Sequence, residues 1–347
     1  MEGDGGGGPT HNARGEMGMN NKQPYNSGVA EIFSNFTRDP CLKRSCKSKN
    51  VCPVGFTCIR AVPPRSGEFR LDLSGCNLRC PFCWTINRPH SWNPEEICEY
   101  IRCRFGQFSA SNLGVSIAYL RITGGEPILN KKRAYHLLEL FRLIDEDVSQ
   151  SKLYEIWKTR KVPKNLTGRK NIKIQTNGIA VPRLHSVFID ELANFRNIAF
   201  TFEVSLKGTN PDESEILSGG LHGAVFFEQI RAIRELMKSE NQGFPIFVRG
   251  ILGIFHSTQY DLVFPNSDER MMLNPSIEFI EIVRELRAMP RPQERVYIEP
   301  LRFTDQMREA EGDCGKLGII AESEVGQNIT AGKKIRITKT LLWEIIS

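Results

Sequence analysis

The chain has 347 residues, of which 40% are apolar and 25% charged, and this composition is ordinary for a globular protein. Its formal net charge is +6. No apolar run approaches the roughly 18 residues that a membrane-spanning helix needs. The first residues also lack the basic and apolar regions of a signal peptide. We therefore expect a cytoplasmic protein that is not held in a membrane.

Four regions follow one another along the chain. Residues 1–40 are glycine-rich without apolar periodicity, which predicts a disordered tail. Residues 41–66 are short of apolar residues and rich in Cys, Lys and Pro, which predicts an extension that folds around a metal. Residues 67–302 alternate strand and helix patterns and form the predicted core, and residues 303–347 form a C-terminal extension.

The core predicts an α/β fold. Six short apolar or β-branched runs predict strands, at residues 69–73, 118–122, 172–175, 198–204, 246–252 and 296–298. Five helical patterns alternate with them, one behind the N-cap Asn93 and the others at 134–144, 187–195, 224–237 and 277–289. This alternation predicts parallel strands joined by right-handed crossovers, in a partial, open (β/α)6 barrel of the TIM type.

Basic residues concentrate in two segments. Residues 152–173 contain eight Lys or Arg against one Glu, and residues 41–60 contain five against none. Such segments suit an acidic protein or an RNA, and a solvated surface explains them equally well. Residues 145–171 exceed the usual helix-to-strand connection of about 2–6 residues. They predict a surface insertion that carries Tyr154 and Trp157.

Cysteines give the strongest chemical signal. In a reducing cytosol, clustered cysteines are more often metal ligands than disulfides. Cys76, Cys80 and Cys83 lie on the loop that leaves the first predicted strand. A [4Fe–4S] cluster usually takes four thiolates, so three would leave one iron open to a small molecule. Zinc would need a fourth ligand, which His90 can supply, so this loop alone leaves both metals open.

A second motif, Gly124-Gly125-Glu126-Pro127, follows the second predicted strand. Paired glycines let the backbone approach a ligand closely, and a carboxylate there can hold an ammonium group. Alone, such a sequence is more often a turn. However, the carboxyl ends of parallel strands meet at one edge, so both motifs should lie where barrel enzymes have their active sites.

Together the two motifs, with Phe82 before the last cysteine, resemble the radical S-adenosylmethionine (radical SAM) superfamily over about residues 67–302. The resemblance implies an enzyme whose three cysteines hold a [4Fe–4S] cluster that binds S-adenosylmethionine. One electron then splits this cofactor into methionine and a 5′-deoxyadenosyl radical, which abstracts hydrogen from a substrate. The substrate is unidentified, a protein, peptide or RNA being among the candidates. An electron donor of the flavodoxin or ferredoxin type is also implied.

The resemblance also implies residues that bind S-adenosylmethionine. Gly124, Gly125 and Glu126 match the motif for the methionine amino group. Polar residues after the third and fourth strands, and one on the fifth, match positions for the ribose, methionine or carboxylate, and they are Thr176, Asn177, Ser205, Lys207 and Arg249. For each, the simple alternative is a strand-end polar residue that meets solvent.

Four upstream cysteines have spacing that fits no zinc or ferredoxin pattern well, and they are Cys41, Cys46, Cys52 and Cys58. Four thiolates can hold a second iron–sulfur cluster or a structural zinc, and non-ligating thiols are the alternative. Cys98 and Cys103 are expected to be buried structural residues. A second hypothesis for the chain is a metal-binding, nucleic-acid-binding module without catalysis. The Gly-Gly-Glu-Pro loop argues against it, since such a module has no need of that loop.

Overall fold

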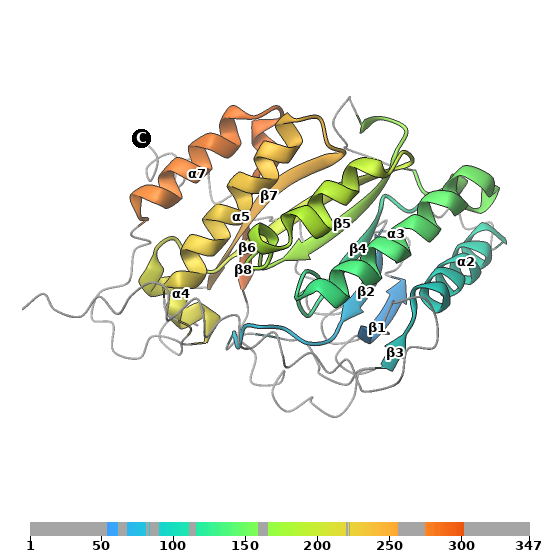
Figure 1. The fold of residues 1–347 in the computed structure, drawn as a ribbon, viewed down its shortest axis with the longest axis horizontal. Helices are drawn as coiled ribbons and strands as arrows, with labels where there is room; N and C mark the ends of the chain where they lie inside the picture. Colours follow the sequence, from blue (N-terminus) through green and yellow to red (C-terminus); the bar gives the residue numbers. More distant parts are fainter. Residues whose placement is uncertain are drawn as a thin grey trace, which may run out of the picture.

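A computed structural model describes residues 54–61, 68–80, 83, 90–110, 116–158, 166–219, 221, 223–255 and 275–301. These residues contain one eight-stranded sheet with the order β3-β1-β2-β4-β5-β6-β7-β8 (Figure 1). Its strands are β1 (Val54–Ala61), β2 (Glu68–Leu73), β3 (His90–Trp92), β4 (Tyr119–Gly124), β5 (Lys170–Thr176), β6 (Ile198–Leu206), β7 (Ile246–Phe255) and β8 (Val296–Leu301).

The six strands from β2 to β8 are parallel neighbours, which confirms the predicted open α/β sheet. The sheet does not close on itself. β2 pairs on its other side with β1, and β1 pairs with β3, both antiparallel, so β3 and β8 are the edge strands of the described sheet. β1 comes from the segment 41–66 that we predicted to fold around a metal. The sheet therefore starts before residue 67, where the predicted core began.

Helices cover one face of the sheet. Figure 1 shows them lying together on that face, and they are α2 (Pro94–Ala110), α3 (Lys131–Gln150), α5 (Ala224–Asn241) and α7 (Ile277–Ala288). Strand residues such as Ile122 and Ile174 are fully buried in the core with these helices. Because side chains alternate along a strand, their neighbours Arg121 and Lys173 point to the opposite face, which we name the inner face.

The start of α2 follows the predicted capping pattern. The side chain of Asn93 accepts a hydrogen bond from Glu96 N, and the Glu96 carboxylate accepts one from Asn93 N, both at 2.8 Å. This reciprocal pair satisfies donors that the first helical turn leaves open. An additional short helix, α4 (Pro211–Ser218), was not predicted.

The helix predicted at 187–195 is wrong in type. The segment forms a π-helical turn, His185–Ile189, followed by a 3₁₀ turn, Asp190–Asn194. Phe188 and Ile189 are adjacent and both fully buried. In a regular α-helix, adjacent side chains point about 100° apart. The π-helical turn has more residues per turn, so this angle is smaller and both side chains can enter the core.

The predicted surface insertion is wrong for its aromatic residues. α3 continues to Gln150, and a 3₁₀ turn, Lys152–Ile156, leads to Trp157. Tyr154 and Trp157 are 1% and 0% exposed, and their rings lie 5.2 and 5.8 Å from that of Phe105. Because Tyr154 and Trp157 bury their aromatic rings, this part of the segment belongs to the hydrophobic core.

Several predictions fall outside the described residues. These are the regions 1–40 and 303–347 and the cysteines Cys41, Cys46 and Cys52; Cys58 lies on β1, where the backbone alone is described. Cys98 is buried as predicted, whereas Cys103 is exposed. Among the described helices, none is both long and apolar enough to cross a membrane.

Candidate active site at the carboxyl ends of the strands

The two sequence motifs meet through their backbones. Gly125 N donates to Leu73 O at 2.7 Å, and Glu126 N donates to Gly75 O at 2.8 Å. A Cβ at position 125 would lie 2.2 Å from Gly75 O, and one at position 124 would lie 2.7 Å from Leu73 O. The paired glycines are thus required for the loop after β4 to pack against the cysteine loop after β2.

A buried arginine holds this junction from the helix side. Arg133, in the first turn of α3, is 0% exposed. Its guanidinium donates to Glu126 O at 2.8 Å and to Gly75 O at 3.3 Å. No local pattern in the sequence distinguishes Arg133 from the other basic residues at the start of that helix.

Glu126 joins the loop after β4 to the end of β5. Its buried carboxylate accepts hydrogen bonds from Thr176 Oγ1 at 2.5 Å, Asn177 N at 2.7 Å and Ile128 N at 2.9 Å. Burial raises the pKa of Glu126, and these three donors oppose the rise. The carboxylate expected to hold an ammonium group is therefore engaged by the chain's own donors, and so is the Thr176 hydroxyl.

Asn177 connects the end of β5 to the cysteine loop. Its Nδ2 donates to Asn77 Oδ1 at 2.7 Å and contacts Cys76 Sγ at 3.7 Å. Its Oδ1 accepts from Ile179 N at 3.1 Å, which fixes the orientation of the amide. Asn77 stands between two residues of the cysteine motif, so the position of this partner was visible in the sequence although its role was not.

The end of β6 brings Ser205 and Lys207 to the same edge. Lys207 Nζ donates to Ser205 Oγ at 2.9 Å. Burial raises the pKa of the Cys80 thiol, and the nearby positive charge of Lys207 opposes that rise. The predicted residues after β2, β4, β5 and β6 are thus gathered in one place.

The cysteine loop rests on a small apolar cluster separate from the main core. Leu78 packs there with Ile179, Leu221 and Val225. Arg79 N donates to Ser218 O at 3.0 Å, at the end of α4. These contacts hold Leu78 and Arg79 against α4 and the start of α5.

The three thiols are a suitable donor set for an iron–sulfur cluster. Cys76, Cys80 and Cys83 are free of disulfides, and Leu78 N donates to Cys76 Sγ at 3.4 Å. Thiolates are the ordinary ligands of such clusters. Within the described ranges, however, no three Cys, His, Asp or Glu side chains converge on one point. The loop therefore supplies the right ligands without forming a closed cage.

Arg249 lies on the inner face, one strand away from Ser205 and Lys207. Its guanidinium is 3.5 Å from Glu203 and 3.1 Å from Glu294. Glu203 also pairs with Arg121 at 2.8 Å and with Lys173 at 3.0 Å. Arg249 thus belongs to a charged group on the inner face, which we name the Glu203 cluster (Glu203, Arg121, Lys173 and Arg249).

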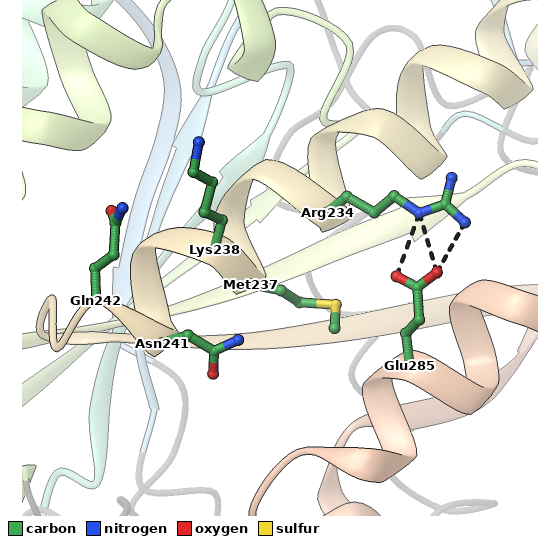
Figure 2. Close-up of a pocket in the computed structure, with 6 residues that line it drawn as sticks. All are labelled: Arg234, Met237, Lys238, Asn241, Gln242 and Glu285. Carbon is green, nitrogen blue, oxygen red and sulfur yellow. Dashed lines mark hydrogen bonds and ion pairs between the residues drawn. The ribbon is translucent and has the colours of Figure 1, made fainter.

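A shallow pocket lies far from this edge, between α5 and α7. Figure 2 shows Arg234 reaching across to Glu285, with hydrogen bonds of 2.8 to 3.2 Å. The other residues that line the pocket lie at the C-terminal end of α5, and they are Met237, Lys238, Asn241 and Gln242. Because α5 runs opposite to the strands, this pocket lies near their amino ends and takes no part in the site.

Comparison with known proteins identifies relatives over most of the core. The radical SAM superfamily model matches residues 72–258. The GTP 3′,8-cyclase of Synechocystis sp. is 24% identical over 256 residues, which are 73% of this chain and 65% of that protein. The GTP 3′,8-cyclase of Alkaliphilus oremlandii is 26% identical over 164 residues, which are 45% of this chain and 40% of that protein. The chain thus spans less than two thirds of either relative.

Among solved structures, one similar chain is Streptococcus suis SuiB bound to S-adenosylmethionine. The match covers 73% of this chain and 43% of the SuiB chain, with 14% sequence identity and a TM-score of 0.35. A second SuiB structure gives 14% identity, a TM-score of 0.32 and coverage of 69% and 49%. The superfamily match includes the three motif cysteines and the Gly-Gly-Glu-Pro loop, and it spans more than half of the sequence. The chain therefore belongs to the radical SAM superfamily.

Proposed function

We propose that Cys76, Cys80 and Cys83 hold a [4Fe–4S] cluster and that S-adenosylmethionine binds beside it, so that a hydrogen atom is abstracted from a substrate on the inner face. The observation that supports this most is the gathering of four strand-end loops. Three of them are joined by the hydrogen bonds that Asn177 N donates to Glu126 and that Asn177 Nδ2 donates to Asn77. When bound, the cluster supplies the electron that splits the sulfonium into methionine and a 5′-deoxyadenosyl radical.

The chain's own residues divide into two groups in this proposal. The backbone of Gly124 and Gly125 and the side chains of Asn177, Ser205 and Lys207 face the cofactor. The Lys207 ammonium suits the methionine carboxylate, because a charge-assisted hydrogen bond is stronger than a neutral one. Buried groups hold these residues in place, and they are Glu126, Thr176 and Arg133.

A one-electron donor is required, and a flavodoxin or ferredoxin fits that need. The four upstream cysteines, Cys41, Cys46, Cys52 and Cys58, remain a proposed second metal site, either an iron–sulfur cluster or zinc. Family membership favours this enzyme over the noncatalytic nucleic-acid module.

A purine nucleotide is the substrate class that we propose next. Two relatives are named GTP 3′,8-cyclases. The Glu203 cluster carries three cations on the inner face, where they are paired with Glu203, Glu68 and Glu294. Arg and Lys are the side chains that bind phosphate. Guidance of an acidic protein or RNA by residues 152–173 is less well supported. That segment leads into the amino end of β5, and Lys170 and Lys173 are engaged with Trp157 O and Glu203.

The cofactor proposal is tested by anaerobic reconstitution with iron and sulfide, followed by dithionite and S-adenosylmethionine. We expect 5′-deoxyadenosine to form. Replacing Cys76, Cys80 and Cys83 together by Ala should remove the product and the iron of this cluster, because three ligands are lost. Cys103→Ala is the matched control, since this cysteine is exposed on α2, and it should retain both. A colourless protein that binds zinc and yields no nucleoside would refute the proposal.

The nucleotide proposal has its own test. GTP affinity of the reconstituted protein is measured by equilibrium dialysis, with Lys173→Gln against the exposed control Lys131→Gln. Loss of a buried cation on the phosphate should weaken binding by about tenfold or more, and the control should bind as the parent does. Absence of GTP binding by an enzyme that forms 5′-deoxyadenosine would reject the nucleotide alone.

A further inference from the structure

Gln229 lies where β5 and β6 end, and it faces the site from the helix side. It is in the second turn of α5 and is 0% exposed. Its Oε1 accepts from Lys207 N at 3.0 Å. Its Nε2 donates to Asn177 O at 2.9 Å and to Ser205 O at 2.7 Å. One side chain therefore binds the backbone of three residues of the proposed cofactor site.

The three bonds need the mixed chemistry of a carboxamide. Both hydrogens of Nε2 go to carbonyl oxygens, and Oε1 receives an amide hydrogen. A carboxylate in this place has no hydrogen for the two carbonyls, and an aliphatic side chain satisfies none of the three groups. The amide orientation is fixed as well, because a flip would set Nε2 against Lys207 N.

Packing of α5 does not account for this residue. The helix is held to the sheet by an apolar stripe that includes Ile230, Ile233 and Leu236. Burying a polar amide among them is costly unless its hydrogen bonds are made. The bonds made here all reach the strand ends, so they connect α5 to the proposed site.

The consequences for the site follow from what the three residues do. Asn177 reaches Asn77 and Cys76 with its side chain, and Lys207 lies by Cys80 and Ser205. Gln229 holds the backbones of Asn177 and Lys207 and so fixes the distance between these two residues, whose side chains face the cofactor in the proposed site. We infer that Gln229 is a positioning residue for S-adenosylmethionine binding, an inference that rests on the proposed function.

The test uses the full chain, reconstituted anaerobically, with Gln229→Met, which keeps a similar length, and Gln229→Glu, which keeps the acceptor for Lys207 N. The affinity for S-adenosylmethionine is measured by calorimetry and by the change that the cofactor causes in the electron paramagnetic resonance spectrum of the reduced cluster. We expect about tenfold weaker binding or more in both variants, with iron content as in the parent.

Leu236→Ala is the matched control. It removes buried volume from the same helix, two turns away, and touches none of the three backbone groups. It should lower the melting temperature while leaving the affinity for S-adenosylmethionine within about twofold. If Gln229→Met binds the cofactor as the parent does, or if Leu236→Ala weakens binding equally, the inference is overturned. A parent protein that binds no S-adenosylmethionine would overturn the proposed function itself.

Discussion

The carboxylate of Glu126 accepts a hydrogen bond of 2.7 Å from the backbone N–H of Asn177, which lies 51 residues later in the sequence. This contact fastens the loop after β4 to the end of β5. Asn177 in turn reaches the cysteine loop, so three strand ends are linked through two residues.

Glu126→Gln should lower the stability of the fold. The new NH₂ group cannot accept from all the donors that now surround the carboxylate, and a buried donor left unsatisfied costs about 1–3 kcal/mol. Urea unfolding at neutral pH measures the change. Glu155→Gln, at an exposed acid far from the site, should stay within about 0.5 kcal/mol of the parent. Equal stability of both variants would contradict the assigned role.

Gly125→Ala should separate the two motif loops. Its Cβ would lie 2.2 Å from Gly75 O, so one of the two backbones has to move. We expect loss of most bound iron after reconstitution, and formation of 5′-deoxyadenosine to fall by about tenfold or more, since small displacements at a site are costly. Gly250→Ala is the control, because its added Cβ meets neighbours at an ordinary 3.5 Å. Similar iron content in both variants would argue against the packing explanation.

Glu203 should make stability depend on pH in the acid range. Burial raises its pKa, but the charges of Arg121, Lys173 and Arg249 outweigh burial and bring the pKa from 4.5 to about 2. A lowered pKa in the folded state means that the charged form stabilises the fold. Its contribution of about 3 kcal/mol is complete above pH 4.5 and disappears as the pH falls towards 2.

The measurement compares the parent with Glu203→Gln by urea unfolding at pH 7, 5 and 3. We expect Gln to be less stable at pH 7 and 5, because it removes the only carboxylate among the described residues that pairs with Lys173, and one of two beside Arg121 and Arg249. The difference should shrink at pH 3. Glu146→Gln, at an exposed ion pair on α3, should show little difference at any of these values. A gap between the parent and Glu203→Gln that is constant down to pH 3 would refute the assignment.

Trp157→Ala should be strongly destabilising, although its segment read as a surface insertion. The side chain is 0% exposed, and removal of a buried aromatic residue costs about 3–5 kcal/mol. Tyr135, which is 49% exposed, is the matched aromatic control and should lose far less as Ala. Thermal unfolding measures the loss of stability in both variants. A small effect of Trp157→Ala would contradict the assignment of this residue to the core.

Local sequence patterns were sufficient for the parallel strands. Each strand has β-branched or apolar residues on its helix-covered face, and Asn93 with Glu96 is a complete capping signal. β1 and β3 escaped prediction because β1 begins in a polar, cysteine-rich segment and β3 has three residues. The short helix α4 was missed for a similar reason, since eight residues give a weak period.

The site was predictable in its cysteines and glycines and not in its supporting residues. Gly124, Gly125 and the three thiols form contiguous motifs with fixed spacing. Arg133 and Gln229 act through contacts with residues 7 to 58 positions away, and such contacts leave no local pattern. A polar residue in the buried stripe of α5 was the available sign for Gln229. No comparable sign existed for Arg133.

β2 already has a hydrogen-bonded partner on each side, and this decides how the barrel can be entered. The edge strands of the described sheet are β3 and β8, so sealing the cylinder would require β8 to pair with β3. β3 has three residues and β8 has six, so such a pairing would leave half of β8 without a partner and a gap beside it. Any screen between the reacting centre and bulk water has to be laid over the gap by chain outside this sheet or by the substrate itself.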